Sequence, residues 1–209
     1  MHTLIMPPFP DRYSLRLILV RHGEPEEQVK GKCFGRTDPA MSELGRVQIQ
    51  AKLEAIRNFN VRALYTSPLK RASESAAIIG ASLRLCSIVS PELQEINFGD
   101  FEGHSYGEIE EAYPQEYKLW MEHPTEIKFP GGESFAEMKA RITTFQNTLQ
   151  HLHRGETVVL VSHGGTNRIL LAAALGLPDE RVFRIDQAYG AINIIDYFHE
   201  YPVVRLVNG

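Results

Sequence analysis

The chain has 209 residues, of which 43% are hydrophobic and 23% are charged, so its composition is that of a globular protein rather than a disordered or fibrous one. Its 22 basic and 26 acidic side chains give a net charge of −4. This charge argues against a general nucleic-acid-coating function, although it does not exclude a local basic pocket. Two cysteines, Cys33 and Cys86, cannot form a disulfide framework and indicate a reduced, cytoplasmic setting.

The amino-terminal segment, residues 1–14, holds three prolines between Met6 and Pro10. It lacks the basic start and continuous apolar run of a signal peptide, so we expect an extended lead-in. The chain also contains no run of about 18 apolar residues, and the sequence therefore predicts no membrane span. Residues 15–209 are expected to form a single domain.

Short segments rich in strand-forming residues recur along this domain. They are Leu15–Val20, Arg62–Tyr65, Arg84–Val89, Thr157–Val161, Ala191–Phe198 and Val203–Val207. The first and the fourth are continuous apolar runs, which are typical of strands covered by helices on both faces. These runs favour a mostly parallel sheet.

Helical patterns separate the strands. Ser42 is a candidate N-cap for a helix that places Ile49, Leu53 and Ile56 on one face. The clearest periodicity, with steps of three and four residues, predicts a helical core stripe made of Phe135, Met138, Ile142, Phe145, Leu149 and Leu152. Two further helices are expected over Pro68–Gly80 and Thr166–Leu175. The alternation of strands and helices predicts an α/β domain with three layers, α/β/α.

Residues 97–132 differ from the rest because they are rich in Gly, Glu, Tyr and Pro. Short helices are expected near Tyr106–Tyr113 and Gln115–Glu122. We interpret this segment as a lid-like insertion that lies over the sheet and belongs to the same domain.

Two histidines directly follow predicted strands. The first strand continues into Arg21-His22-Gly23-Glu24, and Thr157–Val161 continues into Ser162-His163-Gly164-Gly165. Ligands of open α/β sheets bind outside the carboxyl ends of the strands, and glycine permits a close approach of the backbone. The repeated arrangement favours a functional pair over two histidines that satisfy loop carbonyls.

Other candidate residues carry weaker signals when each is taken alone. Arg71 lies near the start of a predicted helix, where anions are favoured, but a solvated arginine would look the same. Glu92, Glu95 and Glu102 lie in a glycine-containing, partly apolar segment, and composition alone would make them surface carboxylates.

Four motifs in order resemble those of the histidine phosphatase superfamily, in its phosphoglycerate-mutase-like branch. They are Arg21-His22-Gly23-Glu24, Ser67-Pro68-Leu69-x-Arg71-Ala72, Glu95-x-x-Phe98-Gly99 with Glu102-Gly103, and Ser162-His163-Gly164. The loop Gly35–Ser42 also looks like one of this family. The resemblance extends from about Leu17 to about Ile195 and implies the phosphoglycerate-mutase-like fold.

The resemblance implies a role for each matched residue. His22 would be the nucleophile that becomes a phosphohistidine, and Glu95 would be the general acid. Arg21, Arg71 and His163 would hold the phosphoryl group, with cationic neighbours keeping His22 neutral. Further phosphate contacts are expected from Gln28, which stands where many members carry Asn, and from Gly35 and Gly164. No metal ion and no cofactor is implied, because the cationic side chains supply the positive charge.

The sequence favours a phosphatase over a mutase. Glu95 and His163 are 68 positions apart, which resembles the compact phosphatases rather than the mutases with their longer insertion. Pro25, Cys33–Asp38, Trp120 and Pro130–Ser134 resemble the alpha-ribazole phosphatases, which remove the 5′-phosphate of alpha-ribazole phosphate.

Several alternatives remain open at this stage. They are a cofactor-dependent phosphoglycerate-type mutase, a broad-specificity small-molecule or sugar phosphatase, and a non-enzymatic module that binds phosphate esters. The expected partner is a small-molecule phosphate monoester, with neither nucleic acid nor a membrane. The oligomeric state is left open, and a homodimer is compatible with the sequence.

Overall fold

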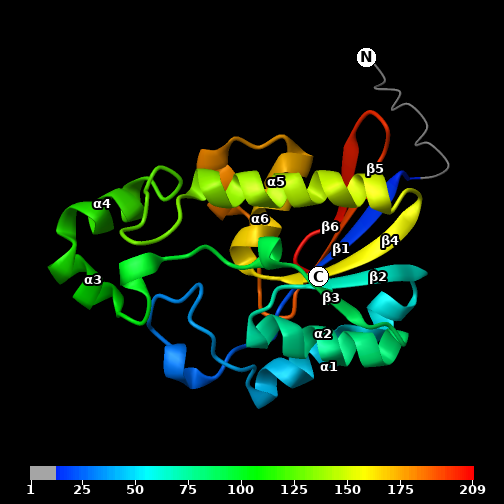
Figure 1. Cartoon of the computed structure of the whole chain (residues 1–209), viewed down its shortest axis with the longest axis horizontal. Helices are drawn as coiled ribbons and strands as arrows, with labels where there is room; N and C mark the ends of the chain where they lie inside the picture. Colours follow the sequence, from blue (N-terminus) through cyan, green and yellow to red (C-terminus); the bar gives the residue numbers. More distant parts are fainter. Residues whose placement is uncertain (1–12) are drawn as a thin grey trace, which may run out of the picture.

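The computed structural model describes residues 13–209 (Figure 1). The expected lead-in over residues 1–14 therefore lies almost wholly outside the described residues. At its end, the backbone N–H of Ser14 donates to the carbonyl oxygen of Tyr197 over 2.7 Å. This hydrogen bond places the start of the described chain beside a strand from the carboxyl-terminal part.

Strands and helices alternate along the described residues. The strands are β1 (Leu15–Arg21), β2 (Val61–Thr66), β3 (Ser87–Val89), β4 (Glu156–Ser162), β5 (Ile192–Tyr197) and β6 (Pro202–Leu206). The α-helices are α1 (Glu43–Arg57), α2 (Lys70–Leu83), α3 (Tyr106–Ala112), α4 (Pro114–Glu122), α5 (Phe135–Leu152) and α6 (Gly164–Leu175). Short 3-10 helices are η1 (Glu27–Val29), η2 (Pro91–Leu93), η3 (Gly99–Phe101) and η4 (Asp179–Arg184). No helix among residues 13–209 is long and apolar enough to cross a membrane.

The strands form one sheet in the order β3-β2-β4-β1-β5-β6. The pairs β3–β2, β2–β4 and β4–β1 are parallel, whereas β5 and β6 pair antiparallel to their neighbours. The predicted α/β fold with a mostly parallel sheet is confirmed. Strands β1 and β4 lie side by side with Arg21 opposite Ser162, so the residues that follow them leave the sheet at the same edge.

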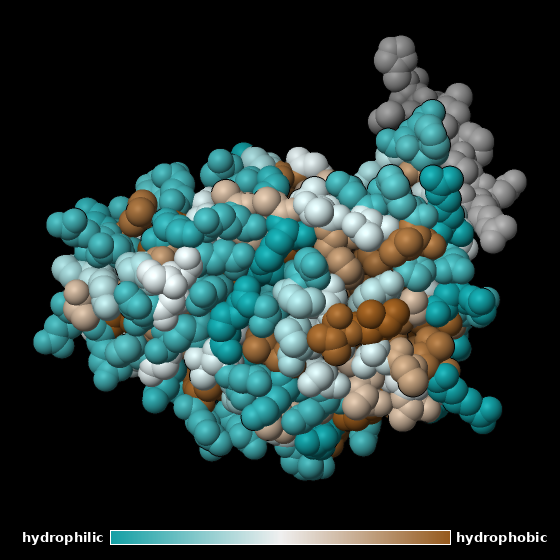
Figure 2. All heavy atoms as spheres, in the orientation of Figure 1, coloured by the Kyte–Doolittle hydropathy of each residue, from teal (hydrophilic) through white to brown (hydrophobic). Residues whose placement is uncertain are grey.

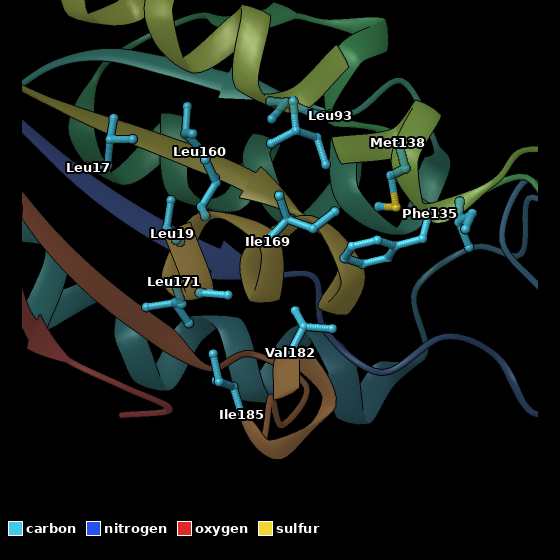
Figure 3. Packing of buried hydrophobic residues seen from close by; sticks show 14 of the residues in the cluster. Leu17, Leu19, Leu93, Phe135, Met138, Leu160, Ile169, Leu171, Val182 and Ile185 are labelled. Atoms are coloured by element: carbon cyan, nitrogen blue, oxygen red, sulfur yellow. The ribbon is translucent and has the colours of Figure 1, made fainter. Parts of the chain in front are cut away.

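Alternating side chains of the central strands build two apolar cores, one on each face of the sheet. Leu17 and Leu19 pack with apolar residues of α5 and α6, as Figure 3 shows from close by. Ile18 and Val20 point to the opposite face and pack with residues of α1 and α2. Because side chains alternate along a strand, a continuous apolar run supplies both cores and produces the three predicted layers.

Side-chain caps explain where two of the helices begin. Ser42 accepts a hydrogen bond from the N–H of Gly45 at the start of α1, as expected from the sequence. Ser134 and Glu137 form a capping box at the start of α5, in which each side chain accepts from the other residue's backbone N–H.

Three local expectations are corrected by the structure. The strand expected over Arg84–Val89 is limited to β3, because Arg84 has φ of 57° and caps α2 in the left-handed conformation. Helix α2 correspondingly extends past the predicted end at Gly80. Leu152, expected in the core stripe of α5, is 66% exposed because it is the last residue of the helix.

The insertion 97–132 does not lie over the sheet. Its helices α3 and α4 form one end of the molecule, on the left of Figure 1, away from the strands. Phe101, Ile109 and Phe129 anchor it to the α5 side of the core. Figure 2 shows that the face in view is largely hydrophilic and that most of its apolar side chains gather in the half away from α3 and α4. Trp120 and Pro124 of the insertion line a cavity together with Glu95, so the insertion lies beside one of the catalytic candidates.

Candidate active site

His22 and His163 come together where β1 and β4 end. Each histidine directly follows its strand, and their ring centroids are 5.0 Å apart. Both are buried, with 2% and 0% of their surfaces exposed. The parallel pairing of the two strands is therefore what brings two residues 141 positions apart into one site.

The ring of His22 is held in one tautomer. Its Nδ1 atom lies 2.7 Å from the carbonyl oxygen of Gly23. A carbonyl oxygen only accepts hydrogen bonds, so Nδ1 carries the proton and Nε2 carries the lone pair. Burial, and then the charges of Arg71 and Arg21, hold the pKa of His22 well below its ordinary value. The expectation of a neutral imidazole is met, with burial as its main cause.

Arg71 is 1% exposed and faces Nε2 of His22. Its Nε donates to that atom over 3.3 Å, while its terminal nitrogens donate to the carbonyl oxygens of Thr37 (2.8 Å) and Gly35 (2.7 Å). The residue lies in the first turn of α2, as the sequence predicts. The carbonyl contacts fix the guanidinium plane without a salt bridge from Arg71 to any carboxylate of the described residues.

Two further nitrogen atoms near His22 are buried and have no hydrogen-bond partner within residues 13–209. They are Nε of Arg21, which is a donor, and Nδ1 of His163. The other ring nitrogen of His163 lies 2.8 Å from the hydroxyl of Ser67, and the tautomer decides which of the two nitrogens donates. Buried polar atoms are nearly always paired in folded proteins, so unpaired nitrogen atoms around one histidine indicate a site made to receive an anion.

Tyr189 forms one wall of this site and was not identified from the sequence. The guanidinium carbon of Arg21 lies 3.9 Å from the centre of the Tyr189 ring, and this ring is 5.5 Å from that of His22. Arg21 also donates to the carbonyl oxygen of Gln187. Tyr189 belongs to an irregular loop before β5 that has no recognisable motif, so no sequence signal would have revealed it.

The carboxylate of Glu95 contacts the first turn of α6, the helix that begins directly after His163. Its carboxylate accepts from the backbone N–H of Gly165 (3.1 Å) and from that of Ile96 (3.1 Å). A Cβ atom on Gly165 would lie 2.3 Å from Oε1 of Glu95. Glycine at this position therefore allows the carboxylate to approach the site. The carbonyl oxygen of Glu95 also receives a hydrogen bond from Arg141 over 3.3 Å.

The other predicted contacts divide into two groups. Gly35 and Gly164 lie at the site, since Gly35 binds Arg71 and a Cβ on Gly164 would lie 3.5 Å from Nε of Arg21. Gln28 is exposed and its amide donates to Glu26, so the structure does not bring it to the site. Glu92 is also exposed and accepts from Ser90.

An apolar cavity of about 160 Å³ opens beside Glu95. Apart from Glu95 and Arg168, its walls are almost entirely apolar, formed by Ile96, Phe98, Trp120, Pro124, Phe129, Phe135, Met138, Gly165, Val182 and Phe183. Trp120 and Phe129 supply aromatic surface to these walls. Tyr106 stacks on Trp120 with ring centroids 5.5 Å apart and lines a separate cavity. Sequence reasoning did not identify Arg168 and Phe183.

Comparison with known proteins defines the family. A model of the histidine phosphatase superfamily (branch 1) matches residues 17–209, and the chain therefore belongs to this superfamily. Phosphoserine phosphatase 1 of Hydrogenobacter thermophilus is 34% identical over 163 residues, which cover 78% of this chain and 77% of the relative. Adenosylcobalamin/alpha-ribazole phosphatase of Escherichia coli is 26% identical over 196 residues, covering 93% and 96%.

A solved structure gives the same result. The native structure of a mycobacterial glucosyl-3-phosphoglycerate phosphatase has a TM-score of 0.83 at 27% identity, covering 93% of this chain and 98% of that one. The chain is thus a phosphoric monoester hydrolase of the histidine phosphatase type, as the motifs predict. The names of these relatives refer to different substrates, so membership of the family leaves the substrate undefined.

Proposed function

We propose that the enzyme hydrolyses phosphate monoesters without a metal ion, through a phosphohistidine formed on Nε2 of His22. The observation that carries this proposal is the neutral, buried ring of His22 beside the guanidinium groups of Arg21 and Arg71 and the ring of His163. Neutral imidazole is a competent nucleophile, and fixed cations stabilise the charge on a transferring phosphoryl group.

Each step has a group on this chain to perform it. Nε2 of His22 attacks phosphorus, the ester P–O bond breaks, and a protonated Glu95 gives its proton to the leaving oxygen. In the second step Glu95 takes a proton from water, the water oxygen attacks phosphorus, and the P–N bond breaks to release inorganic phosphate. The arginines bind the phosphoryl oxygens with forked donors, which is a role that Mg²⁺ fills in other phosphoryl-transfer enzymes.

For the substrate, we propose an ester whose leaving group carries a flat aromatic base, such as alpha-ribazole 5′-phosphate, in which a ribose joins the phosphate to the base. The leaving oxygen must lie within reach of Glu95, and Glu95 is in the wall of the apolar cavity. The leaving group therefore occupies this cavity, where Trp120, Phe98 and Phe129 offer aromatic surfaces. The alpha-ribazole phosphatase among the relatives agrees with this choice.

Other activities receive less support. A simple sugar phosphate has no aromatic ring to pack against these walls, which weighs against a dedicated sugar phosphatase. A phosphoglycerate-type mutase needs the same phosphohistidine, but it must retain a small polar product beside it. A non-catalytic phosphate-ester module would have no need of a carboxylate held at the mouth of the cavity.

A phosphatase panel with and without EDTA tests the proposal. The panel contains alpha-ribazole 5′-phosphate, 3-phosphoglycerate, phosphoserine, sugar phosphates and p-nitrophenyl phosphate. We expect activity that EDTA leaves unchanged and a kcat/KM more than tenfold higher for alpha-ribazole 5′-phosphate than for phosphoserine, 3-phosphoglycerate or the sugar phosphates. Strict metal dependence would contradict the mechanism, and a preference for phosphoserine or sugar phosphates would contradict the substrate assignment.

A further inference from the structure

Glu102 is a carboxylate that the reaction does not consume but that contacts two of the loops around the site. It accepts hydrogen bonds from the backbone N–H groups of Gly35 (3.0 Å), Arg36 (2.7 Å) and Thr37 (2.9 Å), and from the hydroxyl of Thr37. It also accepts from the N–H of Phe98 over 3.2 Å. The carboxylate of Glu102 thus accepts hydrogen bonds from the N–H groups of the loop 35–37 and from one N–H group of the loop that follows Glu95.

The loop 35–37 turns its carbonyl groups the other way, toward Arg71. The carbonyl oxygens of Gly35 and Thr37 accept from the two terminal nitrogens of Arg71, at 2.7 Å and 2.8 Å. Both residues therefore bind Glu102 through N–H and Arg71 through C=O. We call the loop 35–37 the strap, because it connects the carboxylate of Glu102 to the guanidinium of Arg71. The strap orients the guanidinium whose Nε donates to His22.

This indirect arrangement has an electrostatic consequence. Within the described residues Glu102 forms no salt bridge, so its negative charge acts on Arg71 only from a distance. A carboxylate in direct contact would orient the guanidinium but would also neutralise more of the charge that a phosphate needs. Neutral carbonyl groups orient the guanidinium without such a contact. Burial would raise the pKa of Glu102, but the hydrogen bonds from Thr37 and the strap lower it, which keeps the carboxylate ionised.

The strap also fits closely against the loop of Glu95. A Cβ atom on Gly35 would lie 1.9 Å from the carbonyl oxygen of Ile96 and 2.8 Å from the ring of Phe98. Since Glu102 binds the N–H of Phe98 as well, the same carboxylate holds the strap and the Glu95 loop against each other. A change at Glu102 is therefore transmitted to both the phosphate-binding and the proton-donating parts of the site.

We propose that Glu102 is a positioning residue that sets the orientation of Arg71, and with it the phosphate-binding geometry, by holding the strap 35–37. This inference rests on the proposed function only in taking Arg71 as a phosphate ligand.

The test uses Glu102→Gln, which preserves the shape of the side chain but replaces one acceptor oxygen with an NH₂ group that opposes the N–H donors of the strap. Isothermal titration with inorganic phosphate and with orthovanadate measures the phosphate site directly. We expect both to bind at least about tenfold more weakly, and kcat for p-nitrophenyl phosphate to fall by a similar factor. Glu108→Gln is the matched control, because Glu108 also accepts from a backbone N–H and a hydroxyl, but at the exposed start of α3.

A double-mutant cycle separates positioning from a general loss of structure. In an Arg71→Lys background, which lacks the planar fork, Glu102→Gln should weaken vanadate binding by less than about threefold. Equal effects in both backgrounds would overturn the proposal, as would unchanged phosphate affinity in Glu102→Gln. If Glu102→Gln fails to fold, Thr37→Val removes one hydroxyl donor and must still weaken vanadate binding more than Glu108→Gln does. A wild-type protein that binds phosphate without hydrolysing esters would refute the proposed function but leave this test intact.

Discussion

Nε of Arg71 donates to Nε2 of His22 over 3.3 Å, while Nδ1 of the same ring lies 2.7 Å from the carbonyl oxygen of Gly23. The contact with Gly23 leaves Nε2 as the ring nitrogen that can attack, and the contact with Arg71 places a guanidinium beside that nitrogen. The site is therefore organised by the backbone and by Arg71 before any substrate binds, which is the preorganisation that electrostatic catalysis requires.

His22→Ala should abolish the covalent intermediate. Without a nucleophile the reaction cannot be divided into two steps, and kcat should fall by at least about a thousandfold. The enzyme is mixed with a ³²P-labelled ester and quenched rapidly, and the label bound to the protein is measured. A phosphohistidine keeps this label in base and loses it in acid. Glu95→Gln is the companion variant, and it should still become labelled by a substrate with a good leaving group. A labelled or active His22→Ala enzyme would refute the mechanism.

The stability of the protein should fall as the pH falls below about 6.5. In the unfolded chain histidine titrates near that value, whereas burial and neighbouring cations hold the pKa of His22 and His163 well below it. Between these values the unfolded state binds more protons, so the free energy of unfolding decreases with falling pH and levels off below the folded pKa values. Each histidine contributes a slope of up to about 1.4 kcal/mol per pH unit.

Urea unfolding of wild type and His22→Asn at pH 7 and pH 5 measures this effect. Carboxylates titrate equally in both proteins, so the difference between them isolates the histidine. The variant should lose up to about 2 kcal/mol less stability than wild type over this interval. An equal loss in both proteins would show that His22 does not titrate as a buried neutral group.

Asp196 should contribute to stability without affecting catalysis. It is 1% exposed on β5 and binds Arg16 of β1 (2.5 and 2.7 Å) and Arg205 of β6 (2.9 Å). Asp196→Ala removes the carboxylate between two cations and should lower the free energy of unfolding by about 2–3 kcal/mol. A larger loss is not expected, because the side chains of both arginines are partly exposed to solvent. Chemical denaturation measures this change. Glu126→Ala, which breaks an exposed contact with His123, should change stability little.

Sequence patterns predicted the parts of the site that depend on a single strand and its following loop. Because an apolar run indicates a buried strand, the histidines after two such runs could be placed at one sheet edge. That β1 and β4 are direct neighbours depends on strand order, which the sequence does not show. Leu152 was wrongly placed in the core because periodicity continues to the last turn of α5, where no neighbouring layer covers it.

Residues that act through tertiary contact could not be identified in this way. Glu102 belongs to one of the matched motifs, but its role depends on a strap 65 positions or more away, which the motif does not reveal. Tyr189 and Arg168 reach the site from an irregular loop and from within α6, where no spacing rule marks them. Gln28 was predicted by alignment with a family position, but the loop that carries it turns its side chain toward Glu26.

The apolar cavity makes a prediction about specificity. Phe183 is 50% exposed and lines the cavity, so Phe183→Ala removes aromatic surface without emptying the core. We expect KM for an aromatic ester to rise about tenfold, while kcat/KM for phosphoserine stays unchanged because that leaving group is too small to reach Phe183. Leu175→Ala removes a similarly exposed apolar side chain at the end of α6 and serves as the control. Equal effects on both substrates would place the leaving group elsewhere.

A single methyl group at Gly165 should uncouple proton transfer from phosphate binding. In Gly165→Ala the new Cβ would lie 2.3 Å from Oε1 of Glu95, so the carboxylate must move, whereas no contact with Arg21 or Arg71 is altered. We expect kcat for an alkyl phosphate to fall about ten- to a hundredfold, because a displacement near 1 Å has effects of this size, with vanadate affinity within about twofold of wild type. The fall should be smaller for p-nitrophenyl phosphate, whose leaving group needs little protonation. Gly107→Ala, where a Cβ meets nothing within 4 Å, provides the matched control, and a parallel loss of vanadate binding in Gly165→Ala would contradict the separate role of Glu95.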